Sequence, residues 1–329
     1  SGNKDTGPRG DAGAFLEQER SMMANNNNYW RGVLIVLGTT MLWGAMGPIA
    51  KLISAHGVSQ VTVMCYRSLF VTVVVGGWLL AVKGKKAFCP GRRMFVFYSL
   101  LGLFSLVFNA TGNMLSCVYL TIPQALIIHY TYPLVTMAGS MLVTHEKPTL
   151  LQVVAGICIV AGLYIGFDFV HGGPGAVSTA GVLWGVLSVF GMSGQTLISR
   201  RISKTEKPDA VLQLFFSYLV GGVILLIGKS VLAGWSDAAL VTPKVFALMQ
   251  YPAIAGSLLA FLLFYSALKY IPAPTVSLIT SLEIVFALVL TPLMLKQTPS
   301  SHELAGCAII LAAVVITTVG NAKKTAKAA

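Results

Sequence analysis

Ten long apolar segments run through the chain and constrain its fold more than any other feature. They cover residues 32–53, 59–82, 94–115, 121–144, 149–168, 179–199, 210–233, 251–268, 273–295 and 303–320. A helix needs about 20 apolar residues to cross a bilayer, whereas buried helices of soluble proteins are often only about 10–14 residues long. No segment alternates apolar and polar residues as a membrane β-strand does. The sequence therefore predicts an all-α integral membrane protein with ten transmembrane helices.

The composition is typical of a protein surrounded by lipid, and it argues against a nucleic-acid-binding, disulfide-rich or metal-binding protein. Only 10% of the 329 residues are charged and 55% are hydrophobic, whereas soluble domains carry about 25% charged residues. The net charge of +12 comes from short basic runs between the apolar segments, so we expect no nucleic-acid partner. The five cysteines show no paired spacing, which predicts neither a disulfide framework nor a metal site. With no nucleotide-binding glycine loop either, we expect no cofactor and no enzymatic activity.

The basic residues predict the orientation of the chain. If the amino terminus lies inside, fifteen Lys and Arg residues fall in inside connections, including the basic tail at 323–329, and only four fall on the outside: Lys51, Lys229, Lys244 and Lys296. Because cytoplasmic loops carry the excess of Lys and Arg, both termini are expected in the cytoplasm. The polar residues 1–28 are expected to be disordered, and residues 1–21 are interpreted as a vector-derived tail ahead of a natural start at Met22 or Met23.

An internal duplication divides the chain into two repeats. Residues 109–148 and 260–299 align without a gap at an offset of 151, so that YLTIP at 119–123 faces YIPAP at 270–274, and EKP at 146–148 faces QTP at 297–299. We assign residues 29–168 to the first repeat and 169–322 to the second, with five helices each. Because five is odd, the second repeat enters the membrane from the opposite side. This predicts inverted repeats with a solute site at their interface, near the bilayer midplane.

Several short motifs resemble one transporter family. They are Trp43-Gly44 followed by PIAK at 48–51, Arg67, Glu146, YSALKY at 265–270, Pro274, Glu283 and Gly306. Together they resemble the EamA branch of the drug/metabolite transporter superfamily over about residues 30–320. Two positions depart from the family pattern: Ile284 stands where Pro is frequent, and Gln297 where Glu is frequent.

The resemblance implies a secondary transporter in a cell membrane, here the bacterial cytoplasmic membrane. It implies export of small metabolites such as amino acids, aromatic ones included, by alternating access, and it is compatible with proton coupling. The first alternative is uptake of a quaternary amine such as choline, caged by Tyr132 and Trp43 and balanced by Glu283. An alternative of another class is a membrane scaffold or enzyme. A single chain already contains both repeats, so a monomer suffices, and a homodimer is the alternative.

Glu283 is the first candidate for the site because it is the only acidic residue deep inside an apolar segment. A carboxylate at that depth costs about 2.5–3.5 kcal/mol on insertion scales. It must therefore pair, face a wet cavity or hold a proton. We expect it to accept a proton or to balance a cationic substrate, and the alternative is a hydrogen bond that joins helices.

Further candidates are polar or aromatic side chains inside the predicted helices. His129 and Tyr132 share one helix face, and Tyr132 aligns with Glu283 between the repeats. The other candidate lining residues are Asn109, Asn113, Trp43, Tyr66, Tyr265 and Gln195. Arg67, Glu146 and Lys147 are interpreted as gate or structural residues, and for Arg67 a bidentate contact with a substrate carboxylate is a further alternative. For each of these, packing or a satisfied hydrogen bond between helices is the alternative.

The inverted topology predicts that residues 146 and 297 lie on opposite sides of the membrane. In a chain freed of its own cysteines, Gln297→Cys should react with a membrane-impermeant maleimide added to intact cells. Glu146→Cys should react only after the cells are permeabilised. Labelling of both positions from the same side would contradict the inverted repeat.

Overall fold

The computed structural model describes residues 9–120, 122–145, 147–166, 178–205 and 209–296, and parts of 301–316. Within these ranges the regular structure is helical throughout. The first half contains α1 (Arg9–Gly44), α2 (Met46–Ser54), α3 (Gln60–Lys83), η1 (Lys85–Phe88), α4 (Arg92–Gly102), η2 (Leu103–Thr111), α5 (Gly112–Tyr119), α6 (Ile122–His129), α7 (Tyr132–Val143) and α8 (Leu150–Gly166). The second half contains α9 (Thr179–Thr205), α10 (Ala210–Leu232), η4 (Ser236–Leu240), α11 (Pro243–Ala253), η5 (Ile254–Leu259), α12 (Ala260–Ala267), α13 (Ala273–Thr280) and α14 (Glu283–Leu295).

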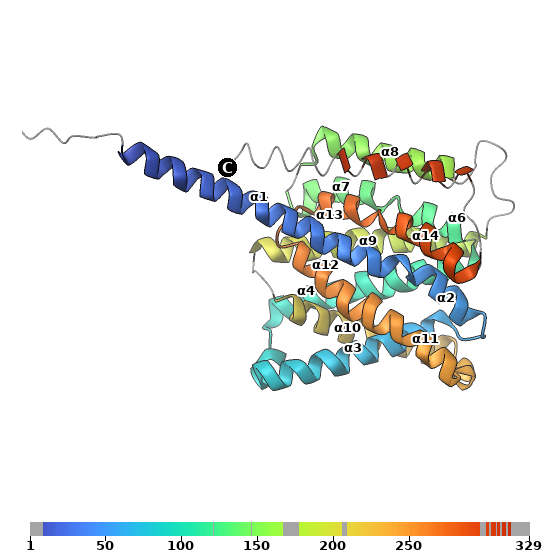
Figure 1. Ribbon diagram of the computed structural model, residues 1–329. Coiled ribbons are helices and arrows are strands. Elements are labelled where there is room, and N and C mark those ends of the chain that lie inside the picture. Colours follow the sequence, from blue (N-terminus) through green and yellow to red (C-terminus); the bar gives the residue numbers. More distant parts are fainter. Residues whose placement is uncertain are drawn as a thin grey trace, which may run out of the picture.

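The ten predicted apolar segments correspond to helical segments of one bundle (Figure 1). Within the described ranges, seven helical stretches are long and apolar enough to cross a membrane, and three shorter apolar helices cover 132–143, 150–165 and 304–313. Large apolar side chains stay exposed on the outside of the bundle, as at Leu142, Leu150 and Leu232. Such a surface suits lipid and not water. The all-α membrane fold expected from the sequence is therefore confirmed.

Two boundaries differ from the sequence prediction. The structure extends α1 back to Arg9, so residues 9–28 are helical where disorder was predicted, and the first turns of α1 project beyond the bundle in Figure 1. Good helix formers at 16–24 (LEQERSMMA) explain this extension. The eighth span begins at Pro243 and not near 251, because Thr242 caps α11 and Pro243 occupies its first turn, whereas Pro252 lies inside the helix.

Irregular backbone occurs at matching positions of the two repeats. The third span contains a π-helical segment, η2, beginning at Leu103, and the eighth contains another, η5, beginning at Ile254. The fourth span is interrupted just before Tyr132, and the ninth just before Glu283. Both pairs of positions are 151 apart, the offset of the sequence duplication. The two repeats therefore share the positions of their π-helical segments and helix breaks as well as the order of their helices.

The break before Glu283 forms although no proline follows it. Hydroxyl groups of the preceding turn bond to backbone carbonyls, as in Ser281 Oγ to Ser277 O at 3.1 Å, and this competes with regular helix geometry. Backbone bonds over three residues join Ser281 to Leu278 and Leu282 to Ile279. Glu283 consequently occupies the first turn of α14, where the helix dipole favours a negative charge.

Small residues and hydroxyl groups hold the two repeats together. A Cβ atom at Gly102 would lie 2.4 Å from Ser217 O, and one at Gly221 would lie 2.7 Å from Gly102 O, so α4 and α10 approach at backbone distance. Ser193 Oγ donates to Tyr132 O at 3.1 Å, and Ser68 Oγ donates to Tyr218 O at 2.9 Å. Close contacts of this kind replace the hydrophobic effect as the association force between helices in lipid.

Two polar clusters tie α3 to α10, one at each end of the pair. In the Asp237 clasp, Asp237 accepts hydrogen bonds from Ser59 N at 2.9 Å, Thr62 Oγ1 at 2.5 Å and Lys229 Nζ at 2.9 Å. In the Asp209 clasp, Lys83 at the end of α3 pairs with Asp209, the N-cap of α10. The start of each helix thus meets the end of the other, so α3 and α10 are antiparallel, as inverted repeats require.

The Asp237 clasp should make stability depend on acid pH. Burial raises the pKa of Asp237, but hydrogen bonds from Thr62, Lys229 and Ser59 outweigh burial and hold that pKa below its ordinary value of 3.8. A depressed pKa in the folded state stabilises the fold above the pKa of the unfolded chain, and this contribution is lost as pH falls. Asp237→Asn should lower the melting temperature at pH 7 and flatten its decline between pH 5 and pH 3. Lys244→Gln, outside the clasp, serves as the control. If Asp237→Asn had the melting temperature of the parent at pH 7 and the same decline between pH 5 and pH 3, the expectation would be contradicted.

Candidate functional site

A cavity lies between the two repeats at the level of the broken helices. Its lining comes from the first repeat through Trp43, Met46, Arg67, Asn109, Ala110, Asn113, Met114 and His129, and from the second through Met192, Phe261 and Glu283. The cavity has a volume of about 50 Å³, well below the range of about 300–1,000 Å³ typical of small-molecule sites. The predicted location at the repeat interface thus coincides with a pocket.

The irregular segments build the walls of this cavity. Asn109 and Ala110 belong to the π-helical segment η2, and Glu283 opens α14. From η5, the carbonyl of Gly256 accepts the indole N–H of Trp43 at 2.9 Å, and Ser257 contacts Arg67. Irregular backbone at membrane depth is tolerated where it faces protein or a water-filled cavity. The π-helical segments and helix breaks therefore lie at the cavity, where they expose backbone polar groups and change the direction of side chains.

Arg67 contributes a buried positive charge to the cavity. Only 2% of the residue is exposed, its Nε donates to Ser257 Oγ at 2.7 Å, and its Nη1 lies 3.3 Å from Met64 Sδ. Among the described residues, no carboxylate pairs with Arg67. Arg67, interpreted above as a gate or structural residue, lies in the pocket wall, and its role stays a prediction.

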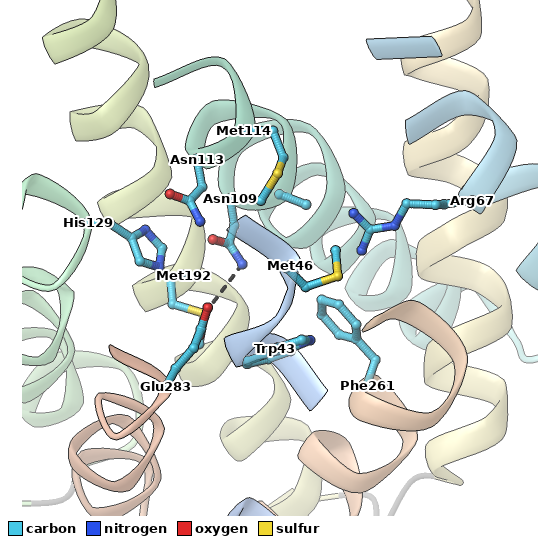
Figure 2. Close-up of a pocket in the computed structure, with 11 residues that line it drawn as sticks. Trp43, Met46, Arg67, Asn109, Asn113, Met114, His129, Met192, Phe261 and Glu283 are labelled. Carbon is cyan, nitrogen blue, oxygen red and sulfur yellow. Dashed lines mark hydrogen bonds between the residues drawn. The ribbon is translucent and has the colours of Figure 1, made fainter. Parts of the chain in front are cut away.

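Glu283 contributes a carboxyl group on the other side. Its side chain is partly exposed, and the surface it exposes faces the cavity. No Lys or Arg in the described part of the chain forms an ion pair with it. Figure 2 shows Arg67 on one side of the pocket and Glu283 on the other, with Trp43 and Phe261 between them. The pocket therefore holds a guanidinium group and a carboxyl group that do not form an ion pair with each other.

His129 lies on the same side of the pocket as Glu283 in Figure 2. Its Nδ1 is 2.9 Å from Ser188 Oγ, and the Ser188 hydroxyl donates to the carbonyl of Gly185 at 2.6 Å. Because the hydroxyl proton is already used, Nδ1 must be the donor to Ser188. In the neutral imidazole this leaves Nε2 as a hydrogen-bond acceptor. His129 was expected to line the cavity, and it does.

Asn109 and Asn113 also line the pocket, in line with their shared helix face. Asn109 Nδ2 contacts Met192 Sδ at 3.3 Å (dashed in Figure 2) and Gln195 Oε1 at 3.4 Å. Asn113 Oδ1 is buried and makes no hydrogen bond within the described structure. A buried polar atom without a partner is costly, so this oxygen is a candidate ligand-binding atom.

Four other candidates lie behind or away from the lining. Tyr132 is buried with its hydroxyl donating to Ser277 O at 2.9 Å, although its ring centroid lies 5.3 Å from that of His129. Gln195 is fully buried behind Asn109. Tyr66 bonds to Gln250 Oε1 at 2.8 Å outside the pocket, and Tyr265 packs against Phe261 with a ring distance of 5.8 Å.

The two remaining candidates follow α7. Lys147 is exposed outside the pocket, and Glu146 lies outside the described residues. Their assignment as gate residues stays a prediction.

Sequence reasoning missed the apolar part of the lining. Met46, Met114, Met192, Phe261 and Ala110 face the cavity, but apolar residues in an apolar span carry no signal that separates lining from packing. The only signal for two of them is their position next to candidate residues in the sequence. Met114 comes directly after Asn113, and Phe261 lies four residues before the candidate Tyr265, on the same helix face.

Comparisons with known proteins agree with this architecture. The sequence profile of the EamA-like transporter family matches residues 30–167 and again residues 179–319. A relative from Salmonella typhimurium, the uncharacterized inner membrane transporter YicL, is 24% identical over 307 residues, which are 91% of this chain and 98% of the relative. One solved crystal structure superposes with a TM-score of 0.69 at 16% identity over 89% of this chain and 98% of its own, and this likeness concerns the fold alone.

The two profile matches fall on the two repeats recognised in the sequence, and they leave out the polar segments before, between and after them. The chain belongs to the EamA-like transporter family.

Proposed function

We propose that the chain is a secondary transporter that exports small metabolites, amino acids among them, by alternating access through the cavity between its repeats. One observation carries the proposal: residues of both repeats line a pocket that contains a carboxyl group, Glu283, with no ion-pair partner in the described part of the chain. A site held between two inverted repeats is exposed to either side when one repeat rocks against the other.

The two clasps fit such a cycle. Each joins the first repeat to the second at one end of the α3–α10 pair. Two conformations of similar energy follow when the two repeats exchange their roles, and a solute shifts the balance only through its different affinity for each. Opening at one face then requires the clasp at that face to loosen while the other holds.

Glu283 is the proposed coupling residue. A carboxylate inside a span costs less when it is protonated, so it gains a proton in one conformation and releases it in a wetter one. The partly exposed surface of Glu283 within the pocket gives protons and substrate access to the same group. Substrate and proton therefore compete for one site, which is the basis of an exchanger.

The proposal of export rests on the family, and the proposal that both termini lie in the cytoplasm rests on the distribution of Lys and Arg along the chain. The relative's name places that protein in an inner membrane, and we extend this to the present chain with both termini in the cytoplasm. The geometry favours the quaternary-amine importer less, because Tyr132 does not line the pocket with Trp43. A membrane enzyme or scaffold would not explain a transporter-family match to both repeats.

Replacement of the carboxylate tests the coupling. In proteoliposomes, Glu283→Gln should remove the stimulation of amino-acid flux by a pH gradient and lower that driven flux by about tenfold or more, because the amide cannot take up a proton. The melting temperature should stay near that of the parent. Glu19→Gln, ahead of the first span, is the matched control. Flux with an unchanged pH dependence in Glu283→Gln would refute the proton role.

A further inference from the structure

We propose that a groove between α1 and α12 binds one anionic phospholipid, with Arg31 on its phosphate and an acyl chain along the apolar part of the groove. The groove lies outside the cavity between the repeats, and its occupant is independent of what that cavity transports. Its walls nevertheless come from both repeats.

The groove forms where α1 packs against α12 (Figure 1). Its volume of about 520 Å³ is far larger than that of the cavity between the repeats. Most of the lining comes from one face of α1, and α12 adds one residue: Asn27, Trp30, Arg31, Leu34, Ile35, Gly38 and Leu263. Because Gly38 has no side chain, α1 leaves space above Leu263, and a Cβ atom there would lie 3.4 Å from Leu263 Cδ1.

The lining changes from polar to apolar along α1. Trp30 and Arg31 come directly before the first predicted span, at the membrane surface, and Leu34, Ile35 and Gly38 follow inside that span. Arg31 and Gly38 are seven residues apart, which is about 10 Å along a helix. Trp is enriched at the membrane–water interface and apolar residues in the hydrocarbon layer. The groove thus has the order of groups that a phospholipid has, with a charged end followed by an apolar one.

Basic residues gather at the polar end of the groove. Arg31 is exposed, and its guanidinium carbon lies 5.3 Å from the centroid of the Tyr270 ring. No carboxylate pairs with Arg31 among the described residues. Arg200 Nη1 donates to Leu268 O at 2.9 Å in the same α12–α13 connection, and the exposed Lys269 follows directly. A guanidinium held over an aromatic ring still has N–H donors, and these bind phosphate in a fork geometry.

Charge complementarity selects the occupant. Arg31, Arg200 and Lys269 belong to the connections that the distribution of Lys and Arg predicts on the cytoplasmic side. The cytoplasmic leaflet carries anionic lipids, and basic pockets between helices on that side bind their headgroups. An apolar helix of another chain would fill the groove but would give Arg31 no anion. An anionic phospholipid matches both ends of the groove.

Lipid retention tests the preference for an anionic headgroup. The purified full chain in detergent is offered equal amounts of dioleoyl phosphatidylglycerol and dioleoyl phosphatidylcholine, which share their acyl chains, and bound lipid is measured by native mass spectrometry. We expect phosphatidylglycerol to be retained about fivefold or more over phosphatidylcholine, the factor that one Lys or Arg contributes near an anionic surface. Glycerophosphoglycerol, the headgroup without acyl chains, should not displace the lipid at equal concentration.

Two variants assign the preference to the two ends of the groove. Arg31→Gln should remove most of it, and Arg31→Lys should keep part. Arg93→Gln is the matched control, since Arg93 is also exposed and lies 6.0 Å from the Phe97 ring, outside the groove. Gly38→Leu should fill the apolar part and lower retention of phosphatidylglycerol. Gly77→Leu, on an exposed face of α3 where a Cβ atom meets nothing within 4 Å, should leave retention unchanged.

Photocrosslinking locates the lipid on the unmodified protein, so it decides the matter even where a variant does not fold. In phosphatidylcholine vesicles with a trace of phosphatidylglycerol that carries a diazirine in one acyl chain, light should link the probe to peptides containing residues 30–38 or 260–267. Labels spread over the other lipid-facing helices overturn the proposal. Equal retention of the two lipids, or Arg31→Gln retention that matches Arg93→Gln, overturns it as well. Displacement by glycerophosphoglycerol at equal concentration would assign Arg31 to a free anion and overturn the lipid site.

Discussion

Two ionisable side chains inside the membrane-spanning bundle, Arg67 and Glu283, constrain the rest of this structure. Each ionised side chain at that depth costs about 2.5–3.5 kcal/mol on insertion scales, and Arg67 and Glu283 do not offset this cost by pairing with each other. The bundle must therefore keep a polar cavity between them. That cavity in turn permits helix breaks and π-helical segments that lipid-facing backbone could not tolerate. Packing everywhere else serves to enclose it.

The backbone is more symmetric than the site it encloses. The π-helical segments and the breaks recur at an offset of 151, but the side chains at the matching positions differ. Glu283 corresponds to Tyr132, whose hydroxyl is committed to Ser277. Ser59 and Asp209 are the N-caps of corresponding helices, α3 and α10. Counted from these caps, Arg67 of the first repeat corresponds to Ser217 of the second. Because Arg67 and Glu283 are not duplicated, the cavity is asymmetric although the backbone around it is repeated.

The sequence predicted the spans, the repeat and Glu283, because each of these depends on local hydropathy or on a comparison of the chain with itself. It did not predict the break before Glu283, which arises from hydroxyl groups that bond back to carbonyls where proline is absent. It also left the position of Arg67 open. A basic residue eight positions into a helix is compatible with a place at the membrane surface, and only its contact with Ser257, 190 residues away, fixes it in the pocket. Apolar lining residues such as Phe261 require the same long-range information.

The two clasps differ in a way that bears on the balance between conformations. In the Asp237 clasp, Lys229 and Asp237 keep 1% and 16% of their side chains exposed, whereas Lys83 and Asp209 keep 34% each. Exposed ion pairs contribute about 0–1 kcal/mol, while hydrogen bonds in a drier setting are stronger. Separation at the start of α3 therefore costs more than separation at its end. In the proposed cycle this difference favours closure on the Asp237 side, and it arises from side chains that do not line the cavity.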